Sequence, residues 1–576
     1  MTQPRVAVTA VERTGVKSKV NRRTFLSSVA AAGLAATAVG CSTGGSKASE
    51  AQCVTALKFP KSTVAPRPGE MPSKVTNTPI AWTKYPKPYV TMPKPPGNGG
   101  AVTTFQILFS SPPPALKNNP WWQQLNKRLG VTIQPTLVAS SDYATKLLTL
   151  AASGNFPDIT YINFNQNGLY NGAGFEKFIS EGAFHDLTQY LSGSGLKDFP
   201  NLQQIPPLTW QGSAFEGKLY GVPYPIQAVN GQLGMYRKDW AQKLGVDNPK
   251  NANEVLDMFV AFATEDPDGD GKSDTYGLDG LRQSMWMGMF RAPNNWRLNK
   301  DGTLQKDFET DEYRAVLEFT NTLWRKKAIH PDALTLTLDQ EEELIQSGKT
   351  GFFTQGGWGF FGDQPNTQYT LARQNNPKAN LQPWLPPGHD GGKPAMAIGT
   401  ASYGFGGIPS SIKDEKRIVE LIHIMEYWAA PFGSDEFTFM YKGIEGEMFN
   451  YVDGAPVAVS NGKQNWANGI NYLCGPQEIN YFYANQPGFA QTMQHWQEVQ
   501  LDGATADPTQ GLYSPSWVQN AAALVQMEQD AFNSIAVGHK PMSYLDEVIK
   551  NWRAQGGDKA RKEFQTALQK CPPTSG

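Results

Sequence analysis

Strand-like and helix-like segments alternate along the first part of the globular chain, and this alternation constrains the fold more than any other feature. Residues 103–109 read as a strand, 119–129 as a helix and 131–133 as a second strand. A further helix, which ends at Gly154, leads into another strand that opens at 156–159. Such alternation is typical of a mostly parallel sheet that is covered by helices on both faces. We therefore predict an α/β fold.

Length and charge narrow the classes of protein that fit. The 576 residues exceed what one small core can organise, so we expect at least two domains. The net charge is −1 and no segment forms a basic domain, which disfavours nucleic acid as a partner because phosphate neutralisation needs clustered Lys and Arg. Apolar residues at helical spacing in 254–264 and 418–428 are expected to be core residues.

The N-terminus resembles an export signal. Residues 21–26 resemble the twin-arginine motif, and the Ala-rich stretch after them is too short and too weakly apolar to span a bilayer stably. The stretch ends in Val-Gly-Cys at 39–41, which resembles a lipobox in which Cys41 becomes the lipidated first residue. Ala38 stands where Leu is usual, so cleavage and release remains an alternative, as does a chance Arg pair. We expect an exported protein, lipid-anchored at the outer face of the cytoplasmic membrane.

A Pro-rich segment separates this signal from the globular part. Residues 1–40 are the predicted signal peptide, and residues 41–100 are a predicted tether, rich in Pro, Ser, Thr and Lys. Trp82, Tyr85 and Tyr89 indicate that the second half of the tether lies on the body of the protein.

Signatures of catalysis and of thiolate chemistry are sparse. The sequence has no Cys-x-x-Cys pair, so it indicates neither a redox motif nor a thiolate zinc site. It also has no His-Glu-x-x-His and no Gly-x-Ser-x-Gly motif. If Cys41 is lipidated, one disulfide could still join two of Cys53, Cys474 and Cys571, and the sequence leaves open which two.

A series of short segments together resembles the family 1 extracellular solute-binding proteins, especially the oligosaccharide-type lipoproteins. The number and order of the segments carry the resemblance, which runs from about residue 103 to about 455 and more weakly to the end. The segments are 154–159 (Gly-Asn-Phe-Pro-Asp-Ile), 182–187 (Gly-Ala-Phe-His-Asp-Leu), 217–224 (Gly-Lys-Leu-Tyr-Gly-Val-Pro-Tyr), 236–240 (Tyr-Arg-Lys-Asp-Trp), 243–245 (Lys-Leu-Gly) and 348–351 (Gly-Lys-Thr-Gly).

The resemblance implies a periplasmic-binding-protein-like fold of type II, with two α/β lobes, crossing hinge strands and a ligand cleft between the lobes. Residues 234–237 resemble the strand that enters the second lobe, and residues 403–408 resemble the strand that returns to the first. The predicted lobes are 101–228 plus 402–460 for lobe one, and 229–401 plus 461–576, with the C-terminal helices, for lobe two.

Residues 266–274 form the sharpest single motif, D-x-D-x-D-G-x-x-D. Carboxylates at alternate positions converge when the chain curls around a hard cation, and Gly271 permits the sharp turn. The loop is not a full EF-hand, because Gly277 occupies the twelfth position where Glu is needed. Related oligosaccharide binders carry a similar calcium loop, often with an acidic residue where Thr275 stands here. A solvated acidic turn is the alternative. The predicted ligands of a structural calcium ion are Asp266, Asp268, Asp270, Asp274 and the backbone carbonyl of Lys272.

The ligand cleft rests on individual residues. Sugars bind through hydrogen bonds to hydroxyls and through aromatic contact with their apolar ring faces. Trp358, in a Gly-Gly-Trp segment, resembles the Gly-Pro-Trp segment that stacks on sugar in maltose-type binders, and Trp286 lies in a loop that carries another stacking aromatic there. Either Trp could instead be a core residue. Asn165 matches the place of a polar sugar ligand. Tyr224, Gln227 and Asn230 lie beside the expected hinge and are further candidates.

These features favour a monomeric binding protein, not an enzyme, that delivers a carbohydrate, of oligosaccharide type, to the permease subunits of an ABC transporter. Function would then be a closing motion, driven by a ligand that touches both lobes. Two alternatives stay open. An exported carbohydrate-active enzyme would need two opposed carboxylates across the cleft, and the sequence nominates no pair. A surface sugar sensor without a transport role would share every feature above.

Overall fold

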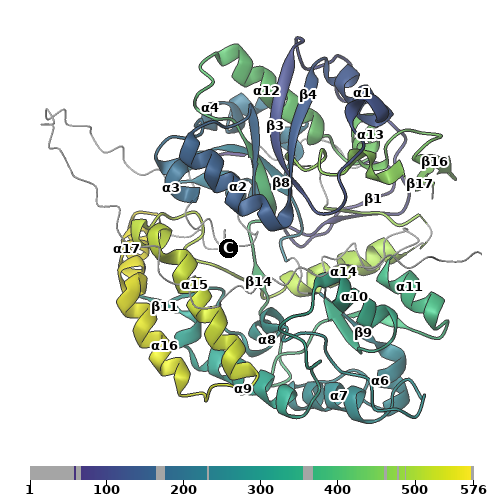
Figure 1. Cartoon of the computed structure of the whole chain (residues 1–576), viewed down its shortest axis with the longest axis vertical. Coiled ribbons are helices and arrows are strands. Elements are labelled where there is room, and N and C mark those ends of the chain that lie inside the picture. The colour runs from purple at the N-terminus through teal and green to yellow at the C-terminus, as the bar shows by residue number, and fades with distance from the viewer. Residues whose placement is uncertain are drawn as a thin grey trace, which may run out of the picture. The chain divides into compact units, whose positions relative to one another are not determined.

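The computed structural model describes nine stretches of the chain: 57–59, 67–163, 175–229, 233–354, 367–459, 463–475, 479–484, 486 and 488–571. Residues 51–576 form one compact unit, and the description below concerns the described residues of that unit. Two separate sheets organise it (Figure 1). We call the five-stranded sheet and its helices the first lobe, and the three-stranded sheet formed by residues 234–237, 352–354 and 381–384, with its helices, the second lobe.

The first-lobe sheet has the strand order β4-β3-β5-β15-β8. Strand β3 pairs in parallel with both β4 and β5, and β15 runs antiparallel to both β5 and β8. The sheet is therefore mostly parallel, as the alternation of strands and helices predicts. The bounds are Ala101–Leu108 for β3, Thr132–Ala139 for β4, Ile159–Ile162 for β5, Gly221–Pro225 for β8 and Ser402–Gly407 for β15.

Two helices that the sequence predicts cover this sheet from its first half. In α1 (Pro120–Leu129), the Asn119 side chain accepts a hydrogen bond from the Trp122 backbone N–H and so caps the helix. Helix α2 (Ser140–Ser153) ends at Gly154, which has φ +70°, the left-handed conformation that glycine adopts most readily. At its start the N-cap residue is Ala139, which provides no side-chain cap.

Two later helices complete the first lobe. They are α12 (Glu415–Trp428) and α13 (Asp435–Lys442). The stripe of α12 that the sequence assigns to the core is buried: Ile418, Leu421, Ile422, Met425 and Trp428 pack with Trp121 and Leu125 of α1. Removing these large side chains from water stabilises the lobe, because each fully buried aliphatic side chain contributes about 1.5–3 kcal/mol.

The second lobe is built on an antiparallel sheet with the order β12-β9-β13. Its core is rich in aromatic rings, among them Phe259, Phe352 and Trp384, whose ring centroids lie 5.5–5.8 Å apart. The strands are β9 (Gly234–Arg237), β12 (Phe352–Thr354) and β13 (Leu381–Trp384), and the helices are α6 (Lys238–Leu244), α7 (Ala252–Thr264), α8 (Gln283–Phe290), α9 (Asp311–Arg325), α10 (Leu338–Gln346) and α11 (Gln368–Asn375).

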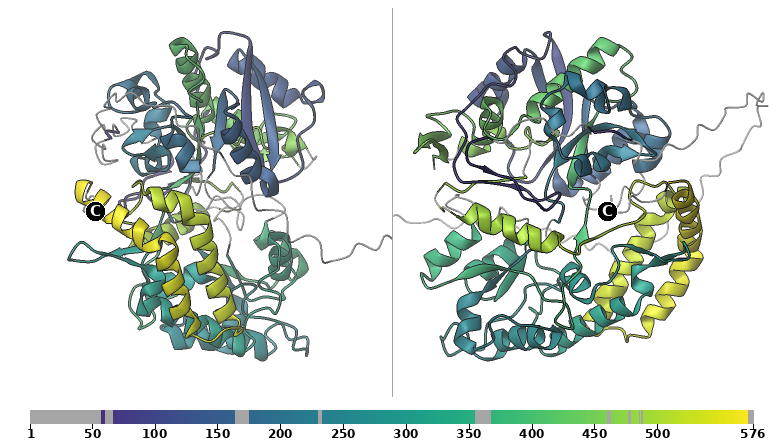
Figure 2. Two further views of the ribbon diagram at one scale, coloured as in Figure 1. Left: turned by 60° about the vertical axis from the view of Figure 1, so that its left-hand side comes forward. Right: turned by 180° about the vertical axis from the view of Figure 1, so that it is seen from behind.

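The C-terminal helices extend the second lobe. Helix α15 (Pro515–Ala536) packs against α9, and helices α16 (Tyr544–Trp552) and α17 (Asp558–Lys570) pack against α15 (Figures 1 and 2). Their apolar faces join the second-lobe core through Trp517, Phe532, Leu545, Trp552 and Phe564. Helix α14 (Phe489–Leu501) lies between the two lobes in both figures.

The packing differs from the predicted lobe boundaries at 463–475. Ala467, Ile470 and Leu473 belong to the first-lobe core, whereas the sequence assigns everything after residue 460 to the second lobe. The sequence missed this return because the segment is irregular and has no period that could be matched to either lobe.

The described part of the predicted tether is built into the fold. Strand β2 (Ile80–Trp82) pairs with β1 (Glu70–Met71) and with β18 (Asn480–Tyr481). Trp82 and Tyr85 are buried against Phe432, which confirms that the second half of the segment lies on the body. An extended Pro-rich segment can therefore pack along the surface of the protein instead of acting as a free linker, when its aromatic residues are buried in a core.

Two segments cross between the lobes and are hydrogen-bonded to each other. The Gly399 backbone N–H donates to the Ala228 carbonyl, and the Ile226 N–H donates to the Ala401 carbonyl, each at 2.9 Å. Strand β14 (Ala397–Ile398), which precedes the second crossing, pairs with β19 (Thr505–Ala506). This paired crossing holds the lobes side by side and positions the cavity described below.

Among the described residues, no helix is long and apolar enough to cross a membrane. Cys474 is a free, buried thiol whose Sγ lies 3.3 Å from the Met425 carbonyl oxygen, and Cys571 is disulfide-bonded.

Candidate ligand-binding site and metal loop

Several first-lobe strands end at the same edge of the sheet. The register pairs Phe405 of β15 with Ile162 of β5, and Ser402 of β15 with Pro225 of β8. The carboxyl ends of β3, β5 and β8 and the amino end of β15 therefore meet there. In open α/β sheets, ligands bind in the crevice outside the carboxyl ends of the strands. This edge is the expected ligand side of the first lobe.

Three aromatic rings gather at this edge, and we call Phe109, Tyr403 and Tyr472 the aromatic edge. The Phe109 ring lies 6.2 Å from the Tyr403 ring and 5.2 Å from the Tyr472 ring, measured between centroids. Phe109 is 41% exposed, which is unusual for Phe and leaves a ring face open to a ligand. Tyr224, a predicted ligand residue, stacks on Tyr472 at 6.0 Å but is only 1% exposed, so it supports the aromatic edge from beneath.

A cavity of about 500 Å³, which we call the main cavity, lies where the two lobes meet. Both crossing segments contribute to its walls, and so does Tyr403 of the aromatic edge. Predicted residue Gln227 lies in its wall. The polar lining comes from Gln211, Gln227, Asn294, Asn295, Thr400, Ser402, Asp507, Thr509 and Gln510, and the aromatic lining from Phe215, Trp296, Tyr403, Trp517 and Phe564.

A second cavity of about 420 Å³, the adjoining cavity, shares Asn294, Asn295 and Ala397 with the first. Helix α8 turns Gln283, Ser284 and Met287 toward it, and Asp307 adds a carboxylate. The shared residues make the two cavities neighbours along one side of the second lobe.

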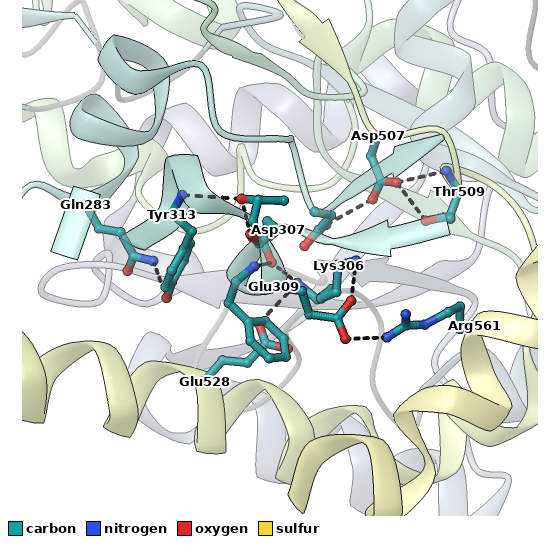
Figure 3. Close-up of polar contacts among 12 residues, drawn as sticks. Gln283, Lys306, Asp307, Glu309, Tyr313, Asp507, Thr509, Glu528 and Arg561 are labelled. Atoms are coloured by element: carbon teal, nitrogen blue, oxygen red, sulfur yellow. Dashed lines mark hydrogen bonds and ion pairs between the residues drawn. The ribbon is translucent and has the colours of Figure 1, made fainter. Parts of the chain in front are cut away.

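Asp507 is the carboxylate of the main cavity. Its Oδ1 accepts hydrogen bonds from the Thr509 backbone N–H at 2.8 Å and from the Thr509 hydroxyl at 2.7 Å, and its Oδ2 accepts one from Asn295 Nδ2 at 2.9 Å (Figure 3). Burial raises the pKa of Asp507, although the hydrogen bonds from Thr509 and Asn295 act to lower it. The hydrogen bonds from Thr509 and Asn295 thus fix the orientation of the Asp507 side chain.

A buried polar cluster, consisting of Lys306, Asp307 and Glu528, lies next to these cavities (Figure 3). The Lys306 Nζ is 2.6 Å from Asp307 Oδ1 and 3.1 Å from Glu528 Oε2, and its side chain is 2% exposed. Burial lowers the pKa of Lys306, but Asp307 and Glu528 outweigh it and raise the pKa above its usual value. Burial raises the pKa of Glu528 to about 7. The cluster joins α15 to the 306–309 turn through charge pairing rather than through apolar contact.

The structure contradicts the predicted position of Trp286. This ring is 0% exposed, its Nε1 donates to the Leu281 carbonyl at 2.8 Å, and it packs against Phe259 and Phe319. The helical repeat of α8 turns Trp286 inward while neighbouring residues of the helix face the adjoining cavity. Trp286 is therefore a core residue. The other predicted ligand residues, Trp358, Asn165 and Asn230, and the predicted lipidation site Cys41 lie outside the described residues.

The aromatic edge and Asp507 were missed at the sequence level. Phe109 is the residue directly after β3, and Tyr403 is the second residue of β15, so both stand at the ligand side of their strands. An aromatic residue at the carboxyl end of a predicted parallel strand is a signal that could have identified Phe109. Asp507 has no such signal, because it reaches the cavity from a segment far along the chain.

Residues 266–274, which we call the aspartate loop, curl as the motif predicts. One carboxylate oxygen from each of Asp266, Asp268 and Asp270 can come within 4.8 Å of the others. Both Asp266 oxygens accept backbone N–H groups of residues 269–271, at 3.0–3.1 Å. Gly271 has φ +79°, as expected for the residue at the sharp turn.

The donor set of the aspartate loop fits a hard cation. Oδ1 of Asp268 and Oδ1 of Asp274 are buried without a hydrogen-bond partner, and carboxylate oxygens of this kind are the ligands that Ca²⁺ prefers. The remaining negative charge is met by lysines: Lys272 Nζ is 3.0 Å from Asp270, and Lys349 Nζ is 2.6 Å from Asp274. Lys349 thus competes for Asp274, the predicted ligand at the ninth position.

The model of the bacterial extracellular solute-binding protein family matches residues 110–425, which is more than half of the chain. The chain belongs to this family. The two lobes, the paired crossing segments and the cavity at their junction are therefore the architecture of a solute-binding protein.

Relatives of this solute-binding protein extend over most of its length. It is 25% identical to the lipoprotein LipO of Bacillus subtilis over 494 residues, which cover 82% of this chain and 93% of LipO. It is also 25% identical to the polygalacturonan/rhamnogalacturonan-binding protein YtcQ of the same organism, with 81% of this chain and 90% of YtcQ covered. The structure of the Streptococcus pneumoniae ABC-transporter substrate-binding protein FusA in complex with kestose matches with a TM-score of 0.58 at 15% identity, covering 81% of this chain and 99% of FusA.

Proposed function

We propose that this solute-binding protein captures a carbohydrate, of oligosaccharide type, in the main cavity. The observation that carries the proposal is the combination of the aromatic edge with a wall of amides and hydroxyls. Flat rings contact the apolar faces of sugars at low entropic cost, and amides both donate to and accept from sugar hydroxyls. The sugar-binding names of YtcQ and FusA support the same class of ligand.

Delivery to an ABC transporter permease is the second part of the proposal. The main cavity takes residues from both lobes, so a ligand inside it contacts both and favours the closed arrangement by its differential affinity. The permease would then recognise the closed form. FusA, which has the same fold, is named as an ABC-transporter substrate-binding protein, and this supports the partner.

Binding rather than catalysis is the better reading of the site. A glycosidase needs a pair of carboxyl groups on either side of the scissile bond. The described lining of the main cavity supplies one carboxylate, Asp507, and that group is tied by hydrogen bonds to Thr509 and Asn295.

Further ligand contacts are proposed from the sequence. Trp358, Asn165 and Asn230 remain the predicted partners of the sugar, in addition to Gln227 in the cavity wall. Trp358→Ala is expected to weaken sugar binding by about tenfold to a hundredfold, because one aromatic contact contributes roughly 1–3 kcal/mol by analogy with stacking on other flat ligands.

Export and anchoring complete the proposal. The twin-arginine-like signal and Cys41 lead us to expect a mature chain that begins at lipidated Cys41 on the outer face of the cytoplasmic membrane. Mass spectrometry of the exported protein tests this directly. An unmodified chain that begins elsewhere would contradict it.

The aspartate loop is proposed to bind one structural calcium ion through Asp266, Asp268, Asp270 and Asp274, together with the Lys272 carbonyl. Bound there, the ion would supply positive charge that ties the end of α7 to the segment that follows the loop. A solved structure of FusA is described as an EF-hand mutant, which supports a cation site in this fold.

A thermal-shift screen of oligosaccharides, followed by titration calorimetry, tests the central proposal. Phe109→Ala should weaken the binding of the sugar that is found by about tenfold to a hundredfold, while the melting temperature stays close to that of the wild type. Leu338→Ala removes an exposed apolar side chain of α10 and serves as the matched control. Equal affinity of the wild type and Phe109→Ala would remove the aromatic edge from the site.

A further inference from the structure

The described lining of the two cavities contains carboxylates but no basic side chain. Lys306, whose charge acts to lower the pKa of Asp507, lies outside the lining and is paired with Asp307 and Glu528. Among the described lining residues of the main cavity, Asp507 is the single ionisable carboxylate, and none is Lys, Arg or His. The described lining of the adjoining cavity adds Asp307, again without a Lys, Arg or His. A ligand that carries carboxylates would enter beside negative groups.

The cations that directly adjoin lining residues in the chain are engaged in ion pairs: Arg282 with Asp279, Arg291 with Asp390, Arg297 with Glu312 and Lys306 with Asp307. Lys306 is held by Asp307 and Glu528, with its side chain 2% exposed. Arg561 lies 2.7 Å from Glu309, whose side chain is 4% exposed. Neither cation can leave its partner for a ligand without uncovering a buried carboxylate, which is strongly unfavourable.

From residue 164 onward, the stretches of sequence between the described ranges add no Lys or Arg; the earlier stretch 60–66 contains Lys61. None of the internal stretches from residue 164 onward contains Lys or Arg, and two of them contain an acidic residue, Asp363 and Glu478. The stretches are 164–174, 230–232, 355–366, 460–462, 476–478, 485 and 487.

From this pattern, and resting on the proposed carbohydrate function, we infer that the cavity selects uncharged oligosaccharides and rejects those built from uronic acids, with Asp507 as a specificity-determining residue. A carboxylate moved from water into this cavity would lose hydration without gaining a cation. The charge of Asp507 would repel it further, and such repulsion is a common source of specificity. A neutral hydroxyl, by contrast, can donate a charge-assisted hydrogen bond to Asp507 Oδ2, which accepts a hydrogen bond from Asn295 Nδ2 and has a second lone pair.

The relatives named above include binders of both classes of sugar, so the inference distinguishes this chain from some of them. YtcQ is named for polygalacturonan, a polymer of uronic acid, and FusA was solved with kestose, a neutral sugar. The inference places this protein with the neutral class, although its identity to YtcQ is 25% over 81% of the chain.

Linkage-matched sugar pairs provide the test. Each pair consists of an oligouronide and its carboxyl-reduced form, for example oligogalacturonide and the corresponding oligogalactoside, or oligomannuronide and the corresponding oligomannoside, added to wild-type protein in a calorimeter. We expect a neutral member to bind, and its uronic acid partner to bind at least about 100-fold more weakly, since it must bury an unpaired charge. The methyl ester of the oligouronide, which is uncharged but similar in size, should recover most of the affinity.

An Asp507→Asn variant tests the role of the side chain. Asn is isosteric and its carbonyl oxygen can keep the hydrogen bonds from Thr509, so the variant should retain the wild-type melting temperature. The ratio of the dissociation constants of the uronic acid member and the neutral member should fall by about tenfold. Asp502→Asn, at an exposed residue that pairs with Lys393 on the surface, makes the same change in net charge and should leave this ratio unchanged.

The outcomes separate the two proposals. Tighter binding of a uronic acid member than of its neutral partner overturns the inference while leaving the carbohydrate function intact. If the difference in affinity between the neutral and the uronic acid member is the same in Asp507→Asn as in the wild type, the role of Asp507 is overturned. Binding of no neutral and no acidic sugar across the panel overturns the proposed carbohydrate function, and the inference falls with it.

Discussion

The aspartate loop and the buried polar cluster both gather carboxylates within the second lobe, and they neutralise that charge in opposite ways. In the loop, Asp266 is half-buried and Asp270 is exposed, and backbone N–H groups and Lys272 meet their charge. In the cluster, Asp307 and Glu528 share one enclosed lysine. A surface loop can keep carboxylate oxygens free for a cation that arrives later, whereas an interior site must hold its counter-charge permanently.

The pKa shifts express the same contrast. For Asp266, burial acts to raise the pKa, but hydrogen bonds from Asp268 and from the backbone N–H groups of residues 269–271 leave the pKa below its usual value. For Glu528, burial dominates and raises the pKa to about 7, despite the charge of Lys306. Solvent therefore decides whether a hydrogen-bonded carboxylate stays charged.

Lys306→Met should have the largest effect, because it leaves Asp307 and Glu528 buried without their cation. We expect the free energy of unfolding to fall by about 3–5 kcal/mol, as for other buried pairs that lose one partner. Denaturant unfolding measures the loss. Lys393→Met is the matched control, since Lys393 is 73% exposed and pairs with Asp502 on the surface. Equal stability of the two variants would show that the cluster does not depend on its lysine.

Removal of calcium should have the next largest effect. A ligand present at 100 times its dissociation constant stabilises the native state by about 2.7 kcal/mol, so a chelator should lower the melting temperature by several degrees. Asp268→Asn should lower the melting temperature in calcium and make it insensitive to the chelator, because Asp268 Oδ1 is a buried oxygen without a partner. If the chelator changes nothing and elemental analysis finds no metal, the aspartate loop is a solvated acidic turn.

The pH dependence of stability should identify Glu528. Its pKa is about 7 in the folded protein and lies near the usual value of 4.5 in the unfolded chain, so its contribution is fully present below about pH 4.5 and is lost as pH rises through 7. The expected loss is about 1–2 kcal/mol, reduced from the full shift because Lys306 is coupled to it. Glu528→Gln should flatten this slope. Because burial also raises the pKa of Asp507, a smaller slope of the same sign should remain.

Lys272→Ala should have the smallest effect. Lys272 is 69% exposed, and its contact with Asp270 is screened by water. We expect the melting temperature in calcium-free buffer to stay within about one degree of the wild type, as is usual for an exposed ion pair. A fall comparable with that of Lys306→Met would contradict the distinction between the two regions.

The same two regions show how much the sequence could predict. The aspartate loop is one contiguous segment, so the spacing of its acids and Gly271 was enough to predict its turn. The α/β alternation and the helical spacing of apolar residues likewise predicted the first-lobe sheet and the helices α1, α2, α7 and α12. Short-range patterns specify local structure because they act through backbone geometry and helical or strand period.

The main cavity could not be predicted in this way. It joins residues near 211–228, 294–296, 397–404 and 507–517, which are distant in sequence and share no motif. Trp286 illustrates the limit: its loop was recognised by resemblance, but one position along α8 decides whether a side chain faces the core or the cavity. The segment 463–475 was placed in the wrong lobe for the same reason, since its contacts with the first-lobe core alone assign it.

A crystal structure of the protein with a bound neutral oligosaccharide would test the proposed capture of sugar most directly. We predict that the sugar occupies the main cavity, with a ring against Tyr403 or Phe109 of the first lobe and hydroxyls within hydrogen-bond distance of Asn295 or Asp507 of the second. A sugar bound outside both cavities, or one that contacts a single lobe, would contradict the proposal that ligand capture closes the two lobes.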